Sequence, residues 1–224
     1  MVVAAGSGVR LGAGVPKALR EVGGRALVAH AVSRLVAGGC THVVVVARPE
    51  LFAAFATALA DCPVPWACAP GGAERQDSVA NGLAEAVRLA PRAQVVLVHD
   101  AARPFVPAAV VARVVERVRG GAAAVVPTIR VSDTIRVADP TDGAHVDRSR
   151  LRAVQTPQGF DLPTLIRAHA HIRRTGLPVT DDATACEAIG IPVALVDGDR
   201  EAFKVTDPFD LLVAEALWSR TGER

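Results

Sequence analysis

The chain has 224 residues, half of them hydrophobic, and a formal net charge of +2 at pH 7. A chain of this length and composition is typical of one α/β domain, which folds without a disulfide or a metal. The near-neutral charge argues against a broad nucleic-acid surface, and no apolar stretch reaches the length of a membrane span. The four cysteines lack metal-ligand spacing. We therefore expect a soluble, cytoplasmic protein that has neither nucleic acid nor membrane as a partner.

The basic residues are unevenly divided between the two types. Of the 25 Lys and Arg residues, only Lys17 and Lys204 are lysines. Lysine presents a compact point charge on a flexible stem, whereas arginine presents a broad planar fork. Composition alone leaves two explanations open: the two lysines are chance survivors, or they stand where the fork does not fit.

Short β-branched runs alternate with helical patterns, which is typical of a mostly parallel sheet with helices on both faces. The unbroken apolar run at residues 43–46 fits a central strand that is buried on both sides. Strands are predicted at residues 2–5, 42–47, 65–69, 95–99, 122–127 and 193–197. Helices are predicted at residues 27–36, 49–60, 75–89, 107–119, 162–174 and 208–218, with Asp161 as an N-cap.

Residues 128–154 interrupt this alternation. The pattern predicts strands at 129–137 and 145–154, joined by a turn at 140–143 whose Asp-Gly pair is a strong hairpin signal. A polar hairpin that leaves its domain needs cover, because an isolated hairpin is only marginally stable. We therefore expect a single domain over residues 1–224 with a protruding β-arm that dimerises with a second copy of the chain.

The first predicted strand runs directly into a glycine-rich segment, residues 4–12. Glycines let backbone N–H groups turn toward phosphate oxygens, and ligands bind at this edge of a parallel sheet. Arg10 and Lys17 follow, and two cations beside such a cradle suit a triphosphate. The absence of a Walker pattern excludes a P-loop NTPase. These residues alone also allow two other interpretations: a tight structural turn, or the loop of a dinucleotide-binding oxidoreductase.

Two further positions carry groups that suit a nucleotide site. Asp100 follows the predicted strand at 95–99, and a carboxylate there suits Mg²⁺, which prefers carboxylate and phosphate oxygens. A purely structural role is the alternative for Asp100, in which its side chain caps the next turn. Gly71-Gly72 allows close approach of the backbone, and Ser78 offers a hydroxyl that donates or accepts. For Ser78 the plain alternative is an ordinary helix-face residue.

Residues 4–12 and Pro16-Lys17 resemble the signature of the 2-C-methyl-D-erythritol 4-phosphate cytidylyltransferases. The resemblance continues in the family's order over nearly the whole chain, at residues 71–79, 99–104, 133–134, 146–148, 155–158 and 203–206. It implies a Rossmann-like α/β fold of the nucleotidyltransferase type. It also implies CTP as a substrate, Mg²⁺ as the cofactor and a homodimer formed through the β-arm.

The resemblance assigns roles to individual residues. It implies nucleotide binding for Ala4, Ala5, Gly6, Ser7, Gly8, Gly72, Arg75, Ser78 and Ala101. The implied catalytic cations are Arg10, Lys17 and Lys204, and the implied metal ligand is Asp100. Acceptor binding is implied for Asp100, Arg103, Thr134, Arg148, Thr156 and Lys204, the arm residues reaching the other subunit's site. Many relatives carry an acidic residue where Ala73 stands, so base recognition here would rest on backbone groups.

The implied reaction is attack by a phosphate oxygen of the acceptor on the α-phosphorus of CTP. A ribitol-5-phosphate cytidylyltransferase would share the fold and most motifs, although Asp181-Asp182 and residues 101–104 lean toward the methylerythritol enzyme. An NADP-dependent oxidoreductase would use the early glycines and Arg48, but it leaves both lysines and the arm without a role. An inactive binding protein is disfavoured because every expected charged position is filled.

Overall fold

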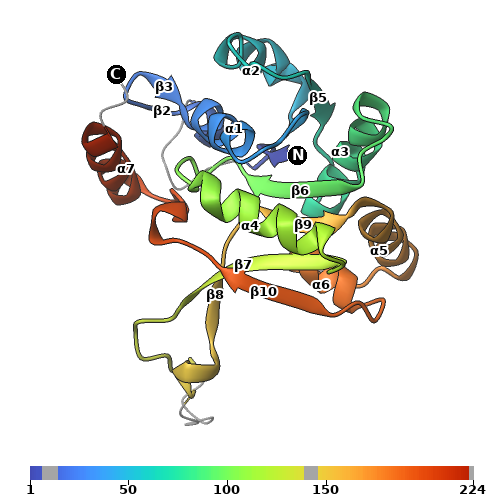
Figure 1. Cartoon of the computed structure of the whole chain (residues 1–224). Coiled ribbons are helices and arrows are strands. Elements are labelled where there is room, and N and C mark those ends of the chain that lie inside the picture. Colours follow the sequence, from blue (N-terminus) through green and yellow to red (C-terminus); the bar gives the residue numbers. More distant parts are fainter. Residues whose placement is uncertain (7–14, 139–145, 222–224) are drawn as a thin grey trace.

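The centre of the structure is a mixed β-sheet with helices on both of its faces (Figure 1). This computed structural model describes residues 1–6, 15–138 and 146–221. The neighbouring strands are, in order, β10 (Val193–Asp197), β7 (Ala124–Arg130), β9 (Gln158–Asp161), β6 (Val95–Asp100), β1 (Val2–Val3), β4 (Val43–Ala47) and β5 (Trp66–Pro70). The short strand β8 (Arg152–Val154) pairs with β7.

Most strands of the described sheet run in one direction. β1 is parallel to β4 and β6, β4 is parallel to β5, and β10 is parallel to β7. β9 is antiparallel to both β6 and β7, so those two strands point the same way, and β8 is antiparallel to β7. The carboxyl ends of the parallel strands therefore meet at one edge, where open α/β sheets bind ligands. The expected Rossmann-like α/β class with a mostly parallel sheet is confirmed.

Separate groups of helices cover the two faces. One hydrophobic core packs α1 (Leu27–Ala37), α2 (Phe52–Ala58) and α4 (Ala108–Arg119) against one face. A second core packs α3 (Arg75–Leu89), α5 (Leu162–Thr175) and α6 (Asp182–Glu187) against the other. Alternate valines of β4 enter different cores, Val43 and Val45 the first, Val44 and Val46 the second. Burial on both sides explains the unbroken apolar run of this strand.

A third, smaller core joins the last helix to a short hairpin. It packs α7 (Pro208–Thr221) against β2 (Glu21–Val22), which pairs with β3 (Arg25–Ala26). Short 3₁₀ turns lie at η2 (Lys17–Leu19), η3 (Pro49–Leu51), η4 (Arg148–Arg150) and η5 (Arg200–Ala202). Among the described helices, none combines the length and the apolar character needed to cross a lipid bilayer.

The predicted elements agree with most of these bounds. α3 and β10 begin and end where the sequence predicts, and Asp161 caps α5 by accepting from the Thr164 N–H at 3.0 Å. The sequence analysis missed β2, β3, β9 and α6. β9 has four residues and contains Gly159, where an added Cβ would lie 2.4 Å from Val114. So short a strand, with a glycine required by close packing, has no apolar periodicity to detect.

The arm differs from its prediction. Among the described residues of 128–154, ladder pairing joins 128–130 of β7 to 152–154 of β8, and Arg136 forms an isolated bridge. The described residues beyond the base project from the body without a continuous strand, and η4 follows Asp147 (Figure 1). The predicted strands at 129–137 and 145–154 are therefore too long, because their outer residues are largely exposed and have no core to cover. The predicted turn at 140–143 lies outside the described residues.

Candidate active site

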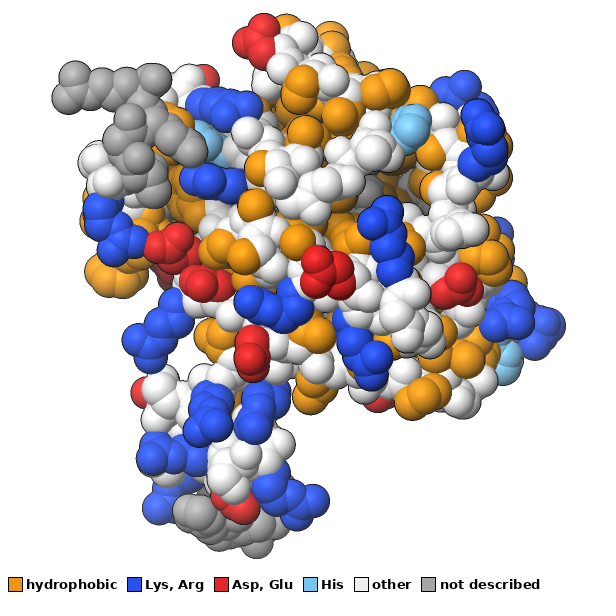
Figure 2. Space-filling model, viewed as in Figure 1, with side chains coloured by type: hydrophobic (Ala, Val, Ile, Leu, Met, Phe, Trp, Pro, Cys, Tyr) orange, Lys and Arg blue, Asp and Glu red, His pale blue; other side chains and the backbone are white. Residues whose placement is uncertain are grey.

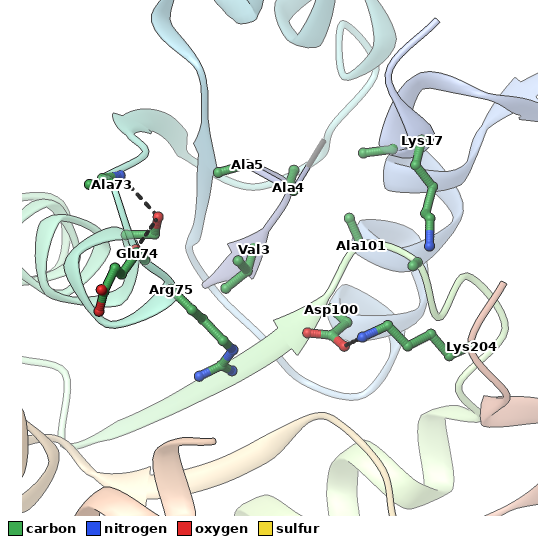
Figure 3. Close-up of a pocket in the computed structure, with 15 residues that line it drawn as sticks. Val3, Ala4, Ala5, Lys17, Ala73, Glu74, Arg75, Asp100, Ala101 and Lys204 are labelled. Carbon is green, nitrogen blue, oxygen red and sulfur yellow. Dashed lines mark hydrogen bonds and ion pairs between the residues drawn. The ribbon is translucent and has the colours of Figure 1, made fainter. Parts of the chain in front are cut away.

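A pocket of about 640 Å³ lies at the carboxyl edge of the sheet, between the ends of β1 and β6. The described residues of its walls come from five separate segments: the end of β1, η2, the loop before and start of α3, the end of β6 and the segment after η5 (Figure 3). The lining residues are Val3, Ala4, Ala5, Gly6, Lys17, Ala18, Gly72, Ala73, Glu74, Arg75, Ser78, Asp100, Ala101, Ala102 and Lys204.

The chain's two lysines both line this pocket. The Lys204 ammonium lies 2.7 Å from Oδ2 of Asp100, and the Lys17 ammonium donates to the backbone carbonyl of Val205 at 2.8 Å. The Val205 N–H in turn donates to the carbonyl of Ala102 at 2.8 Å. Two positive charges separated by 187 positions in the sequence, 17 against 204, therefore meet beside the end of β6 (Figure 3).

Asp100 stands in the pocket as an anion. Burial raises the pKa of this carboxyl, but the charge and hydrogen bond of Lys204, with a smaller contribution from Arg75, outweigh burial and hold the pKa below its usual value. Its side chain is 19% exposed, so it remains open to a ligand. Among the described residues, no group of three or more His, Cys, Asp and Glu side chains could hold a metal ion.

A buried pair behind Asp100 fixes the end of β6. Burial lowers the pKa of His99 to about 4, so its ring is neutral near pH 7. Nε2 lies 3.0 Å from the Arg103 carbonyl, which only accepts, so Nε2 carries the proton and Nδ1 accepts from the Thr156 hydroxyl at 2.9 Å. The same hydroxyl oxygen accepts from the Asp100 N–H at 3.0 Å. Thr156 therefore holds the backbone of Asp100 and does not itself line the pocket.

The loop before α3 is shaped by Ser78. The Gly72 N–H donates to the Ser78 hydroxyl at 2.9 Å, and that hydroxyl donates to the carbonyl of Glu74 at 3.2 Å. An added Cβ at Gly72 would lie 2.1 Å from the Cβ of Asp77, so only glycine fits there. Ser78 is 3% exposed. Its hydroxyl folds the loop against the helix and leaves backbone groups at the pocket wall.

Arg75 continues the same wall and is tied to residues behind it. Its Nη2 donates to Oδ2 of Asp182 at 2.7 Å, and Nε2 of His169 lies 3.0 Å from Oδ1 of the same carboxylate. Asp182 is fully buried at the start of α6. Sequence reasoning missed both Asp182 as a partner of Arg75 and His169, because three different helices supply the side chains and Arg75 lies 107 positions before Asp182.

The structure places the remaining predicted site residues as follows. Arg103 lies beside the pocket, where it donates to the carbonyls of Ala202 at 2.7 Å and Val154 at 3.3 Å. Thr134 and Arg148 are exposed on the arm and do not line the pocket of their own chain. The remaining three, which lie outside the described residues, are Ser7, Gly8 and Arg10.

The chain matches the protein family described as "IspD: 2-C-methyl-D-erythritol 4-phosphate cytidylyltransferase" over residues 1–220. The 2-C-methyl-D-erythritol 4-phosphate cytidylyltransferase of Saccharopolyspora erythraea is 50% identical over 220 residues and covers 97% of each chain. The protein of that name from Streptomyces coelicolor is 45% identical over 233 residues, covering 98% of this chain and 84% of the relative.

A solved structure agrees with the sequence relatives. The crystal structure of 2-C-methyl-D-erythritol 4-phosphate cytidylyltransferase from Thermus thermophilus aligns with a TM-score of 0.79 and 40% identity, covering 96% of each chain. The family match spans both lysines and every segment that lines the pocket. The chain therefore belongs to the 2-C-methyl-D-erythritol 4-phosphate cytidylyltransferase family.

Proposed function

We propose that this chain transfers the cytidylyl group of CTP to 2-C-methyl-D-erythritol 4-phosphate in the pocket beside Asp100. The products are 4-diphosphocytidyl-2-C-methyl-D-erythritol and pyrophosphate, a step in non-mevalonate isoprenoid precursor synthesis. The observation that carries the assignment of the site is the meeting of Lys17, Lys204 and Asp100 in one pocket at the sheet edge. Family membership supplies the reaction class and both substrates.

The chemistry requires positioning and charge stabilisation. A phosphate oxygen of the acceptor attacks the α-phosphorus of CTP in line, the bond from that phosphorus to the bridging oxygen breaks, and pyrophosphate leaves. The acceptor phosphate is mostly dianionic near neutral pH, since its second pKa is about 6, so no general base is needed. Lys17 and Lys204, with Arg10, would stabilise the charge that builds up around the α-phosphorus.

Mg²⁺ fits the chemistry of Asp100. Its carboxylate is ionised, partly open to the pocket and engaged by Lys204 on one oxygen. The other carboxylate oxygen would hold the ion, with substrate phosphate oxygens and water completing the ligands that Mg²⁺ prefers. A bound Mg²⁺ supplies neutralisation of the triphosphate charge before attack.

The nucleotide would lie along the wall formed by the end of β1 and the loop before α3. Backbone groups at Ala4, Ala5 and Gly6 would cradle the phosphates, with Ser7 and Gly8 continuing the segment. Gly72, Arg75, Ser78 and Ala101 line or shape the rest of the wall. Because Ala73 has no polar side chain, the cytosine edge would be recognised by backbone groups of this loop.

The binding site for the acceptor would be completed by the arm of a second subunit. Thr134 and Arg148 would bind its phosphate there, while Arg103 and Thr156 would support the site from within the chain. Two observations support a homodimer: these arm residues do not line the pocket of their own chain, and basic side chains gather on the projecting arm (Figure 2). An arginine fork suits a phosphate, which it binds through two parallel hydrogen bonds. We place this activity in the cytoplasm, where CTP is available.

A pyrophosphate-release assay tests this function. With Mg²⁺ and CTP, the chain should release pyrophosphate with 2-C-methyl-D-erythritol 4-phosphate and not with ribitol 5-phosphate, and UTP or ATP should not replace CTP. Preference for ribitol 5-phosphate would contradict the proposed acceptor. Release with none of these substrates would contradict the reaction.

The relatives reported above give no support to the two rival activities. All of them are named as methylerythritol-phosphate enzymes, none as a ribitol-phosphate enzyme or an oxidoreductase. Arg48, which an NADP enzyme would need at the 2′-phosphate, lies 3.6 Å from Glu50 on the surface and does not line the pocket. The methylerythritol reaction is therefore the one that both the chain's relatives and its pocket support.

A further inference from the structure

The network behind Arg75 is not used by the reaction described above. Arg75 lines the pocket with a side chain that is 35% exposed, while its partner Asp182 is 0% exposed. Asp182 accepts from Arg75 on Oδ2 and lies within hydrogen-bond distance of His169 on Oδ1, at 2.7 and 3.0 Å. A buried carboxylate with a charged partner is costly to assemble and strongly destabilising to break.

Three carboxylates lie within electrostatic reach of Arg75: Asp182, Asp100 and Asp181. Asp182 raises the pKa of Arg75 most among its acidic neighbours, and Asp100 contributes in the same direction. The guanidinium reaches toward Asp100 in the pocket (Figure 3), yet the direct ion pair is with Asp182. Among the described residues, Asp100 has its own ion-pair partner in Lys204. The direct ion pair with Asp182 therefore keeps the Arg75 guanidinium from adding a second cation to Asp100.

The position of Asp182 is itself fixed to the sheet. Gln158, which is 1% exposed at the start of β9, donates to Oδ2 of Asp181 at 2.7 Å and accepts from the Ala183 N–H at 3.3 Å. Asp181 caps α6 by accepting from the Thr184 N–H at 2.9 Å. These bonds hold the first turn of α6, and with it Asp182, at one place behind the pocket.

We propose that Asp182 is a positioning residue for nucleotide binding, which holds the Arg75 guanidinium at the pocket wall and away from Asp100, with His169 holding Asp182. The inference rests on the proposed assignment of this pocket to CTP. It predicts that Asp182 affects CTP affinity only through Arg75. A residue that merely stabilised the fold would affect affinity equally whatever stood at position 75.

A double-mutant cycle tests this role. The dissociation constant of CTP is measured calorimetrically, with Mg²⁺ and without acceptor, in the wild type, Asp182→Asn, Arg75→Gln and the double variant. Asp182→Asn should weaken CTP binding about tenfold in the wild type and less than about twofold in the Arg75→Gln background. Equal weakening in both backgrounds, or none in either, would overturn the proposal.

Two further variants keep the test sharp. His169→Ala leaves the Arg75–Asp182 ion pair in place, so it should weaken CTP binding less than Asp182→Asn does. This effect should again appear only when Arg75 is present. If Asp182→Asn does not fold, His169→Ala replaces it in the cycle. Asp161→Ala removes a helix-capping side chain that does not line the pocket. It should lower stability and leave CTP affinity unchanged, and a tenfold loss there would also count against the proposal.

The wild-type pyrophosphate-release assay separates this inference from the function on which it rests. An active wild type with an additive cycle would overturn the role of Asp182 and leave the activity standing. A wild type that does not bind CTP would overturn both.

Discussion

Lys204 and Asp100 form an ion pair of 2.7 Å at the end of β6, although 104 positions, 100 against 204, separate them in the sequence. The pair is partly exposed, with 44% of the lysine side chain accessible, so water screens it and it contributes little to stability. Its value lies in placing a positive charge beside a carboxylate at the ligand edge of the sheet. Predictions about this pair therefore concern activity more than folding.

Replacing either lysine with alanine should lower the turnover number by roughly 10²–10³, the usual effect of losing one preorganised charge contact. The protein should stay folded, as judged by circular dichroism and thermal unfolding. The turnover number of Lys204→Arg should also fall at least about tenfold, because a planar guanidinium does not reproduce a compact ammonium beside Asp100. The matched control is Arg220→Ala, which removes a surface ion pair with Glu201. Near-wild-type turnover in Lys17→Ala or Lys204→Ala would contradict the catalytic assignment.

Thr156→Val should destabilise the protein by about 1–3 kcal/mol, because it leaves the Asp100 N–H and Nδ1 of His99 buried without a partner. Urea unfolding monitored by fluorescence gives the free energy of unfolding. Thr156→Ser keeps the hydroxyl and should recover most of the loss. Thr57→Val, whose exposed hydroxyl donates to the Ala53 carbonyl, is the matched control and should change stability by less than about 0.5 kcal/mol. A Thr156→Val variant as stable as this control would show that the hydroxyl is not needed at the strand end.

Gly72→Ala should weaken CTP binding by at least about tenfold, because the added Cβ meets the first turn of α3 and the loop has to move. Calorimetric titration with CTP measures the effect. At Gly120, where φ is −77° and the nearest neighbour of an added Cβ is 3.3 Å away, the same substitution should leave CTP affinity unchanged. If both variants bind CTP equally well, the loop before α3 is not part of the nucleotide site.

Stability should fall as the pH rises above about 8. Burial, with nearby carboxylates, raises the pKa of Cys186 to about 12, and the side chain is 0% exposed. The unfolded thiol releases its proton above its ordinary pKa of about 8.5 while the folded thiol keeps it, so the folded state binds more protons and stability decreases with pH.

Because the chain contains no Tyr, its cysteines dominate this alkaline loss; burial also raises the pKa of Cys40 and Cys68, so the share of Cys186 is read from a variant. Between roughly pH 8 and pH 10, Cys186→Ala should lose about 2 kcal/mol less stability than the wild type, measured by urea unfolding. Identical slopes for the two proteins would exclude Cys186 as the titrating group.

Two inactive variants should complement one another if the arm completes a partner's site. In a heterodimer of Lys204→Ala and Arg148→Ala subunits, one site has an intact pocket and an intact arm, whereas the other lacks both. Random mixing makes about half of the dimers mixed, so activity should recover to about a quarter of the wild-type value. Mixing Lys204→Ala with Lys17→Ala is the control and should recover nothing, since both changes lie in the pocket. If the mixture of Lys204→Ala and Arg148→Ala subunits also recovers no activity, that result would count against a site shared between subunits.

The regular elements could be predicted because their side chains follow simple periods. β4 has an unbroken run of valines, and α3 begins at Arg75 where a capping box between Glu74 and Asp77 starts the helix. β9 could not be predicted, because its four residues pair with strands on both sides only after the chain has folded. The arm was predicted as a long hairpin from its turn signal, and that signal carries no information about how far the strands pair.

The site was predictable where the sequence itself is unusual. The two lysines stand out against an arginine-rich background, and both line the pocket. Thr156 was predicted to bind the acceptor substrate, and the structure shows its hydroxyl hydrogen-bonded to His99 and to the Asp100 N–H. The ion pair of Arg75 with Asp182 could not be predicted, because no local pattern links residues that are 107 positions apart.

The confinement of both lysines to one pocket makes the protein chemically addressable. A reagent that forms covalent bonds with side-chain amines has two targets in the whole chain, and both lie at the same cavity. Mass spectrometry of the labelled protein would then report ligand occupancy directly, since a bound triphosphate would shield both amines. An inhibitor with a lysine-directed electrophile would likewise meet no competing side-chain amine elsewhere on the molecule.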